Sequence, residues 1–469
     1  MSVLQIAILA CIAVVVGWFG RGRKLALLAV SVLVLYWLQP HQEPVNLMFW
    51  LPTLTLALAV VSWVITSTPD ARGWKENRGA ALVLLGAVVF VNLSRYFHLD
   101  FFFPVQTPRF QWIALAILTV FVVAFALART GNIRPVVPVL AILSLVGLLA
   151  LVKIPSVLGW LFETVAAIRG KEAGDQSALS WLGFSYVAFR LLHTLLDRIA
   201  GRLPAVALAD YVNYVVFFPS ITAGPIDRLE RFTRDLDNSL PLDKRSWLDA
   251  GTRLFQGLFK KFVVADALAW IALNEVFIQD VRSPGWTWVL LYAYSFRIYF
   301  DFSGYTDIAI GLGRLLGVRL PENFDSPYLK PSLAQFWNSW HMTLTQWFRS
   351  YVFNPLTRVM RTAKRPLPLV LMVLLSQVST MTLIGLWHGV TMNYFLWGVW
   401  HGLGLFVQNR WSEWTRAMNL RSRGALVGAT FKTVGVLLTF HFVTVGWLFF
   451  IFSEPIMVWN AVLKLTGVE

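Results

Sequence analysis

Long apolar runs recur along this chain, separated by short polar connections. A run of about 20 apolar residues is long enough to cross the hydrocarbon core of a bilayer as a helix. Counting the less regular stretches as well, the pattern predicts about 11 to 13 membrane helices and hence an all-α, polytopic membrane protein. The clearest runs are 3–19, 47–65, 112–128, 136–152, 368–387 and 433–452.

The composition agrees with a lipid environment. Of the 469 residues, 57% are hydrophobic and only 14% are charged, whereas soluble domains carry about 25% charged residues. The mean hydropathy is +0.62. The first apolar run lacks the basic start and the small-residue cleavage site of a signal peptide, which favours a retained helix.

Polar residues enter the apolar segments from about residue 176 onward. Polar groups at membrane depth are costly and persist where they are buried in protein or line a wet cavity. We therefore expect residues 1–155 to form membrane helices that complete a wall, and residues 156–469 to form the core that holds the site. Within this core, 227–245 is the best candidate for a cytoplasmic amphipathic segment.

The formal net charge of +15 is concentrated in connections such as 21–24, 70–79, 129–134 and 358–365. The positive-inside rule makes these connections cytoplasmic and places the N-terminus outside. No basic stripe lies on a polar domain, which argues against nucleic-acid binding. The lone Cys11 provides neither a disulfide framework nor a cysteine-based metal site.

Glycines in GLGRLLG, residues 311–317, have neither the spacing nor the preceding strand of a dinucleotide-binding loop, so we expect close helix packing there. Four of the seven histidines also favour ordinary roles. His41 and His98 fall in predicted loops. His193 precedes Asp197 by four residues, which suggests a buried hydrogen bond, although a ligand-facing pair is possible. His441 is expected to be a satisfied core histidine.

His341 lies between tryptophans in FWNSWHMTLTQWFRSY, residues 336–351. If this stretch is one helix, His341 shares a face with Trp337, Leu344 and Thr345.

His388 follows Trp387 at the end of an apolar run and precedes Gly389. A helix that ends at glycine leaves carbonyls unsatisfied and often opens onto a cavity. A neutral imidazole there can accept a hydroxyl proton near neutral pH. The alternative, for His341 as for His388, is a ring held by a backbone carbonyl. Two histidines without a clustered carboxylate or cysteine make a poor zinc set, so no metal is predicted.

Five ordered blocks together closely resemble the membrane-bound O-acyltransferase superfamily, in particular the branch of bacterial alginate O-acetylation. The D-alanyl transfer protein of teichoic acid modification is a nearby cousin. The matching blocks lie between about 180 and 402, with a weaker echo at 443–450, and the first 150 residues match only in being hydrophobic helices. The blocks are FFPSITAGPIDR, GLFKKFVVADALA, YFDFSGYTDIAIGLGRLLGVRLPENFDSPYL, FWNSWHMTLTQWFRSYVFNPL and GLWHGVTMNYFLWGVWHG.

The resemblance implies a ring of helices around a thinned centre, where funnels from both faces meet. It implies that His388 is the catalytic histidine and that His341 is the second functional position. The segment Pro321–Phe324 is expected to shape the tunnel. Asn393 is a candidate to polarise a carbonyl or to orient His388. The full set of expected substrate- or tunnel-lining residues is Asp301, Ser303, Tyr305, Trp337, Trp340, Thr345, Trp387 and Asn393.

Two positions depart from the family pattern. The common Arg-Trp-His is Ser339-Trp340-His341 here, and the common Phe-Arg-Asp-Tyr has Ser350 in place of aspartate. If Ser339 and Ser350 lie on the same helix, a salt bridge is missing or a donor-side contact is altered.

The resemblance implies transfer of a short acyl group, acetyl first among them, across the bacterial inner membrane. The expected donor is acetyl-CoA or an acyl-carrier-protein thioester, with no tightly bound cofactor. The expected acceptor is a hydroxyl of an extracytoplasmic polysaccharide or a partner acyltransferase or esterase-like protein. Membrane lipid is the remaining expected partner. D-alanyl transfer from a carrier protein is the first alternative, and a transporter or a non-catalytic scaffold comes from another class.

Overall fold

The computed structural model is helical, and within the part of the chain that it describes there is no strand, only an isolated antiparallel bridge between Phe324 and Trp340. The structure describes residues 1–20, 22–40, 47–94, 107–130, 133–168, 180–238, 243–418 and 425–468.

Helix α1 (Val3–Trp18) begins with a reciprocal cap. The Ser2 hydroxyl accepts from the amide of Gln5, and the Gln5 side chain accepts from the amide of Ser2.

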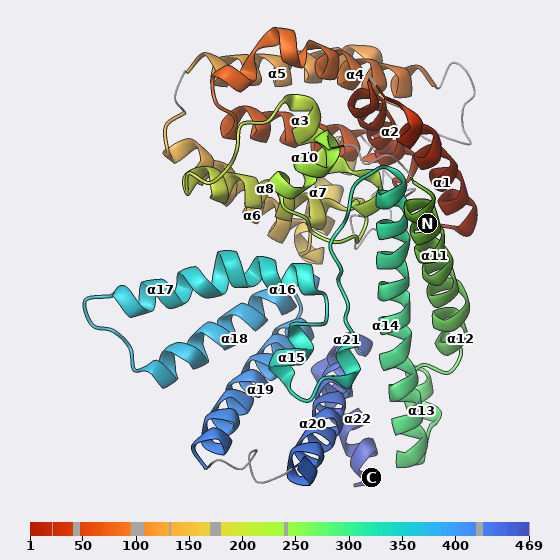
Figure 1. The fold of residues 1–469 in the computed structure, drawn as a ribbon, viewed down its shortest axis with the longest axis vertical. Coiled ribbons are helices and arrows are strands. Elements are labelled where there is room, and N and C mark those ends of the chain that lie inside the picture. Colours follow the sequence, from red (N-terminus) through yellow and green to blue (C-terminus); the bar gives the residue numbers. More distant parts are fainter. Residues whose placement is uncertain are drawn as a thin grey trace. The chain divides into compact units, whose positions relative to one another are not determined.

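The chain forms two compact units. The first comprises Met1–Leu254 and Ile308–Pro321, and the second comprises Phe255–Asp307 and Glu322–Glu469. Two long helices, α11 (Lys244–Phe259) and α14 (Pro284–Leu315), contribute to both (Figure 1). The predicted boundary at residue 155 stays a prediction.

In the first unit α2 packs against α4 and α9, and α3 packs against α5, α8 and α9. The buried Arg190 on α8 donates to the carbonyls of Tyr214 and Val215 at the C-terminal end of α9, where helix carbonyls lack intrahelical partners. The remaining helices of this unit are α2 (Arg23–Trp37), α3 (Leu47–Thr66), α4 (Trp74–Leu93), α5 (Phe110–Arg129), α6 (Val136–Leu151), α7 (Pro155–Ile168), α8 (Phe184–Ile199), α9 (Leu208–Val216) and α10 (Leu229–Asp237).

The second unit holds both candidate histidines. Its core includes a cluster of buried residues from α14, α21 and α22, among them Leu291, Leu448 and Val458. The described part of this unit contains two π-helical turns. One is η4 (Lys260–Ala265), which directly follows α11, and the other is η6 (Arg349–Phe353), which directly follows α16. Its helices are α12 (Asp266–Ala269), α13 (Phe277–Asp280), α15 (Leu333–Trp337), α16 (Met342–Phe348), α17 (Asn354–Thr362), α18 (Leu369–His388), α19 (Met392–Ala417), α20 (Ala425–Gly446), α21 (Leu448–Ile451) and α22 (Pro455–Thr466).

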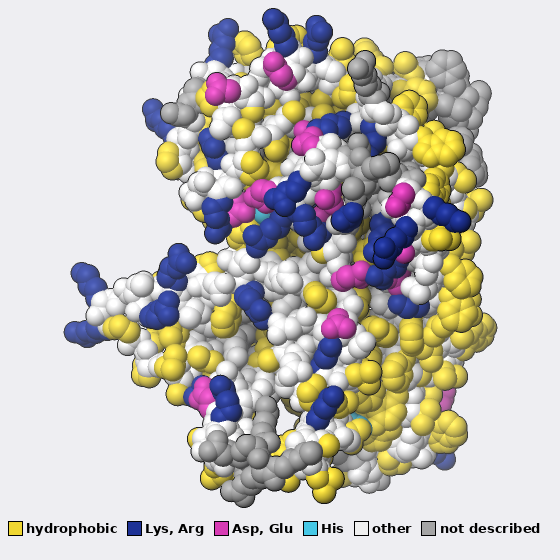
Figure 2. Space-filling view, viewed as in Figure 1, with side chains coloured by type: hydrophobic (Ala, Val, Ile, Leu, Met, Phe, Trp, Pro, Cys, Tyr) yellow, Lys and Arg dark blue, Asp and Glu magenta, His cyan; other side chains and the backbone are white. Residues whose placement is uncertain are grey.

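Five described helices are long and apolar enough to cross a membrane: α3, α4, α5, α18 and the stretch Leu426–Ile451. Helices α1 and α6 are apolar but shorter. Many large apolar side chains are exposed, and in Figure 2 such side chains form broad yellow areas of the surface. Exposed apolar areas of this extent suit contact with lipid. The predicted number of 11 to 13 helices and the ring concern the whole protein and stay predictions.

The predicted glycine packing is confirmed in the first unit. A Cβ on Gly311 would lie 2.8 Å from Cγ of Leu254 and 3.1 Å from the carbonyl oxygen of Ala250, so this glycine lets α14 lie directly against α11. Gly317 has φ +75° just after α14 ends, a conformation that favours glycine.

The assumption that 336–351 is one helix is wrong. Helix α15 ends at Trp337, and α16 begins at Met342 after a turn in which His341 has φ 42° and ψ 53°. Ser339 lies in this turn, whereas Ser350 lies in η6. The two departures from the family pattern are therefore not on the same helix.

The 227–245 segment contains the short amphipathic helix α10. Its buried residues Leu229, Phe232 and Leu236 share one face at helical spacing, and Arg234 lies on the opposite, exposed face. Its predicted cytoplasmic position stays a prediction.

Candidate functional site

His388 is the last residue of α18 and is half-buried. Aromatic rings surround it, with centroid distances of 4.6 Å to Trp387, 4.9 Å to Phe450, 5.6 Å to Trp397 and 6.1 Å to Tyr394. The imidazole thus sits in an aromatic cage that remains partly open, and such a surrounding excludes bulk water without supplying charge.

The helix carrying His388 ends at Gly389, as the sequence predicts. Gly389 is extended, with φ −177°, so backbone conformation does not require glycine here. The ring of Tyr394 requires a glycine here, because a Cβ on Gly389 would lie 2.6 Å from that ring.

Helices α18 and α19 approach each other closely along their length (Figure 1). A Cβ on Gly385 would lie 2.1 Å from the carbonyl oxygen of Tyr394, and one on Gly398 would lie 2.4 Å from Cα of Thr382. These small residues bring the two backbones together, as they do in many membrane helix pairs. The end of α18, and with it His388, is thereby fixed against α19.

The ring of His341, like that of His388, lies near the indole of Trp387. Its ring centroid is 6.2 Å from that of Trp387 and 4.7 Å from that of Phe302, which meets it edge to face. His341 is outside the five apolar spans, and burial, with a smaller contribution from His388, lowers its pKa to about 3. The imidazole of His341 is therefore neutral at physiological pH.

The turn that carries His341 is held by the Pro-Glu-Asn-Phe segment. The carbonyl of Asn323 accepts from the amide of Met342, and the side-chain oxygen of Asn323 accepts from the amide and the hydroxyl of Thr343. The sequence placed this segment at the tunnel wall but gave no sign of this contact, because it arises only where the helix breaks.

Asp301, Ser303 and Tyr305 lie on α14. Asp301 forms an ion pair with Lys261, and the buried Asp307 forms one with Lys260 at 2.6 Å. Ser303 and Tyr305 are both buried. The structure therefore joins Asp301 to the π-turn η4, and it is Phe302, next in sequence, that contacts His341.

The remaining candidates lie around the turn and at the start of α19. Trp337 donates from Nε1 to Nδ1 of the buried His401 at 3.4 Å. Trp340 stacks on Phe336 and contacts Trp447, and Thr345 donates to the carbonyl of Trp340 at 3.4 Å. No role for Trp397 or His401 was predicted from the sequence. They lie one helical turn apart on α19, so their spacing places them on one face of that helix.

Asn393, near the start of α19, donates from Nδ2 to the carbonyl of Phe452 at 2.6 Å and is buried. One of its two N–H donors thus ties α19 to the end of α21.

The two family-pattern departures have local contacts. The Ser339 hydroxyl donates to the carbonyls of Gln335 and Phe336, which closes the end of α15. Arg349, next to Ser350, donates to the side-chain oxygen of Asn338 at 2.7 Å.

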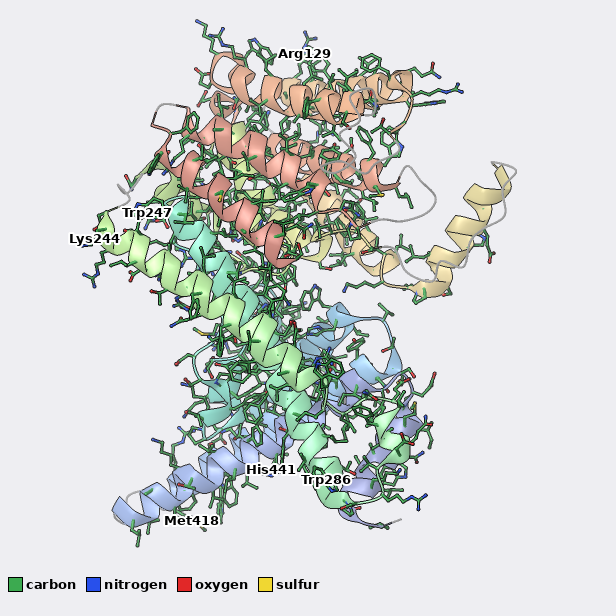
Figure 3. All side chains as sticks on the ribbon, turned by 90° about the vertical axis from the view of Figure 1, so that its right-hand side faces the viewer. Arg129, Lys244, Trp247, Trp286, Met418 and His441 are labelled. Carbon is green, nitrogen blue, oxygen red and sulfur yellow. The ribbon has the colours of Figure 1, made fainter. Side chains whose placement is uncertain are left out.

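The other histidines behave differently. His441, labelled in Figure 3, has both ring nitrogens bonded, Nε2 to the Tyr292 hydroxyl and Nδ1 to the Leu437 carbonyl, each at 2.8 Å. The expectation of a satisfied histidine is confirmed, although the residue is half-buried rather than in a core. His41 and His98 lie outside the described residues.

His193 forms the predicted pair with Asp197, at 3.4 Å between Nδ1 and Oδ2. Ligand atoms of His193, Asp197 and Glu230 lie within 4.8 Å of one another, close enough to hold a metal ion. Arg202, however, pairs with Asp197 at 2.6 Å, and Nε2 of His193 accepts from the amide of Leu229 at 3.4 Å. His193 and Asp197 thus have protein partners in this structure.

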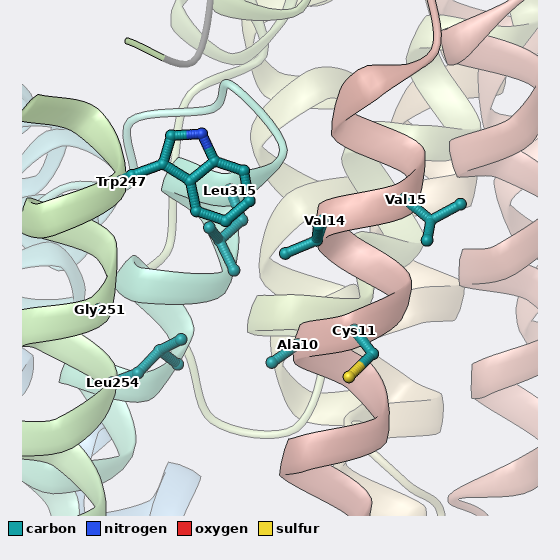
Figure 4. A pocket seen from close by; sticks show the side chains of 8 residues that line it. All are labelled: Ala10, Cys11, Val14, Val15, Trp247, Gly251, Leu254 and Leu315. Atoms are coloured by element: carbon teal, nitrogen blue, oxygen red, sulfur yellow. The ribbon is translucent and has the colours of Figure 1, made fainter. Parts of the chain in front are cut away.

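The first unit also has an apolar groove of about 420 Å³ between α1 and α11 (Figure 4). Hydrocarbon suits such a lining better than a polar substrate does. The residues that line it are Ala10, Cys11, Val14, Val15, Trp247, Gly251, Leu254 and Leu315.

Chemically, the second unit offers two imidazoles that both lie near one indole, that of Trp387. One is buried and neutral, and the other is half-exposed at a helix end. A neutral imidazole can take a proton from a hydroxyl, and an adjacent imidazole can donate or accept a hydrogen bond.

Comparison with known families agrees with this picture. Residues 171–451, more than half of the chain, match the membrane-bound O-acyltransferase family. The match covers both histidines and the whole aromatic cage around His388.

Three relatives illustrate the similarity. The chain is 31% identical over 288 residues to the teichoic acid D-alanyltransferase of Streptococcus thermophilus, covering 59% of this chain and 69% of that protein. It is 34% identical over 273 residues to the probable alginate O-acetylase AlgI of Pseudomonas syringae pv. tomato, covering 57% and 48%. It is 34% identical over 255 residues to the peptidoglycan O-acetyltransferase of Helicobacter pylori, covering 51% and 43%. The chain thus spans about half the length of the two O-acetylating relatives.

Proposed function

The chain belongs to the membrane-bound O-acyltransferase family, and from this premise we propose that it moves a short acyl group, acetyl first among the candidates, from a cytoplasmic thioester to an extracytoplasmic acceptor. The acceptor is a hydroxyl of a polysaccharide or cell-wall polymer, or a partner protein that acylates one. The protein lies in the bacterial inner membrane with its N-terminus outside, as the positive-inside rule predicts.

The observation that carries the proposal is the position of His388. It is half-buried at the end of an apolar helix and within an aromatic cage, and the Trp387 indole of that cage also lies near the neutral His341. A general base needs access to its substrate and protection from bulk water, and this site supplies both.

In the proposed reaction His388 accepts the proton of the acceptor hydroxyl as its oxygen attacks the thioester carbonyl. The new C–O ester bond forms, the C–S bond breaks, and the thiolate leaves with the proton that His388 returns. His341 polarises the carbonyl or orients His388. General base catalysis of this kind contributes about 10²–10⁴ in rate, and positioning together with oxyanion stabilisation supplies the rest.

A D-alanyl group from a carrier-protein thioester is the second candidate. It is favoured by the similarity to a teichoic acid D-alanyltransferase, of which the chain covers 69%. It requires the same histidines, so the identity of the donor decides between the two.

The test uses the purified protein in proteoliposomes with radiolabelled acetyl-CoA outside and alginate or peptidoglycan fragments inside. In parallel, a D-alanyl carrier protein replaces acetyl-CoA. We expect labelled acceptor with the wild type, and a loss of about 10²–10⁴ in rate with His388→Ala. Equal labelling by the wild type and His388→Ala contradicts the assignment of the base.

His441→Ala is the matched control, because its ring is bonded to Tyr292 and to a backbone carbonyl outside the aromatic cage. It should retain the wild-type rate per folded molecule. Flux of a solute or of protons without any acyl transfer supports a transporter instead, and transfer that requires an added partner but not His388 supports a scaffold.

A further inference from the structure

Helix α16 begins without a cap from its own N-cap residue. His341 occupies that position but makes no capping hydrogen bond to the first turn. The first amides of a helix have no intrahelical partner, and a side-chain oxygen of the N-cap residue ordinarily satisfies one of them. Here another residue has to supply that oxygen.

Asn323 supplies it from a different segment. Its Oδ1 accepts from the amide of Thr343 at 3.2 Å and from the Thr343 hydroxyl at 2.7 Å, while its backbone carbonyl accepts from the amide of Met342 at 3.0 Å. Asn323 is 0% exposed, so water does not replace these bonds. The amide of Thr343 is the one that an ordinary N-cap side chain would satisfy.

The same segment also clamps the residues before His341. Phe324 and Trp340 form an antiparallel bridge, and the amide of Asp325 donates to the carbonyl of Ser339 at 3.0 Å. His341 is thereby held in the left-handed conformation, φ 42°, which is uncommon for non-glycine residues. This conformation turns the imidazole towards Phe302 and Trp387, whose rings it contacts.

We propose that Asn323 is a positioning residue for the acyl transfer: it caps α16 in place of His341, so that the imidazole of His341 is released from capping and is held towards Trp387 and His388. The effect on turnover rests on the proposed function, whereas the capping itself does not.

The first test is therefore independent of activity. Hydrogen–deuterium exchange is measured on the purified protein, on a peptide covering residues 338–348. In Asn323→Leu the amide of Thr343 loses its acceptor, so we expect this peptide to exchange at least about tenfold faster at that amide. In Asn323→Asp both side-chain acceptor bonds remain and exchange should stay near wild type. Unchanged exchange in Asn323→Leu overturns the inference.

Asn213→Leu is the matched control for burying a leucine in place of an asparagine. Asn213 is also 0% exposed, donates to the carbonyl of Lys24 and belongs to the first unit. Its variant should lower stability without changing exchange in residues 338–348 or the turnover of the folded protein.

Turnover supplies the second test. We expect Asn323→Leu to lower kcat by about 10–100-fold with little change in KM, since misplacing a catalytic group by about 1 Å costs rate rather than binding. Asn323→Asp should recover kcat to within about threefold of wild type. Because Asn323 acts through His341, Asn323→Leu combined with His341→Ala should match His341→Ala alone.

The outcomes separate the two proposals. A multiplicative loss in the double variant, or a low kcat in Asn323→Leu that Asn323→Asp fails to recover, overturns the positioning role. Wild-type turnover in His341→Ala and His388→Ala instead overturns the proposed function, while the exchange measurement still decides whether Asn323 caps α16.

Discussion

Each unit buries a histidine, and the neighbours of the two rings differ. His193 in the first unit lies beside Asp197, which pairs with Arg202, and accepts from a backbone amide. The nearest rings to His341 in the second unit include those of Phe302 and Trp387. Burial by itself therefore does not distinguish a histidine with structural hydrogen bonds from one proposed to take part in the reaction. The polar partners of His193 indicate a structural role for this ring. The rings of His341 and His388 instead lie among aromatic side chains.

The largest expected effect separates catalysis from stability. His388→Ala should reduce acyl transfer by about 10²–10⁴ with little change in melting temperature, because the ring is only half-buried. His193→Ala should cost about 1–3 kcal/mol of unfolding free energy, because it leaves buried polar partners unsatisfied. Turnover per folded molecule and thermal unfolding in detergent measure the two quantities. If turnover falls as much in His193→Ala as in His388→Ala, the distinction between a structural His193 and a catalytic His388 is wrong.

Gly389→Ala tests the placement of His388 without removing it. The new Cβ would lie 2.6 Å from the Tyr394 ring, so the helix end or the ring has to move. We expect turnover to fall by about tenfold or more. Gly251→Ala on α11 is the control, since nothing lies within 4 Å of its Cβ position. Equal turnover in the two variants contradicts a tight placement of His388.

The pH dependence of stability should reveal His193. Burial lowers its pKa from 6.5 to about 4, against the opposing effect of Asp197 and with the help of Arg228 and Arg202. Between pH 6.5 and 4 the unfolded chain binds a proton that the folded chain does not. The unfolding free energy therefore falls as the pH falls, by up to about 1.4 kcal/mol per pH unit.

His193→Gln should remove this contribution, so the unfolding free energy of the variant should depend less steeply on pH. Thermal unfolding at several values between pH 4.5 and 7.5 measures the difference in slope. An identical slope in both proteins contradicts the assignment of a neutral, buried His193.

The smallest expected effect concerns His441. Tyr292→Phe removes the hydroxyl bonded to Nε2 and should cost about 1 kcal/mol or less, without changing turnover. Thermal unfolding and the transfer assay measure the two. A large loss of turnover would extend the functional region to α20.

Much of the fold followed from local pattern. The apolar runs at 3–19, 47–65, 112–128 and 368–387 form helices within a few residues of their predicted bounds. The end of α18 at Gly389 was also predictable, because hydrophobic periodicity and glycine act over a few residues.

The site was predictable in its residues but not in its geometry. The start of α16 after His341 is held by hydrogen bonds that Asn323, 20 residues before Thr343, accepts, and helix propensity carries no information about them. The π-turns likewise gave no sequence signal. The pairing of Lys261 with Asp301 depends on how η4 meets α14, which no single segment determines.

The contact between α18 and α19 has a consequence for motion. Gly385, Gly398 and Gly402 leave backbone against backbone, with Cβ positions 2.1–2.6 Å from atoms of the opposite helix. Sliding by a fraction of a turn would bring side chains into those positions, so the two helices move as one body. In the proposed reaction His388 then keeps its position, and we expect substrate entry to depend on segments other than α18 and α19.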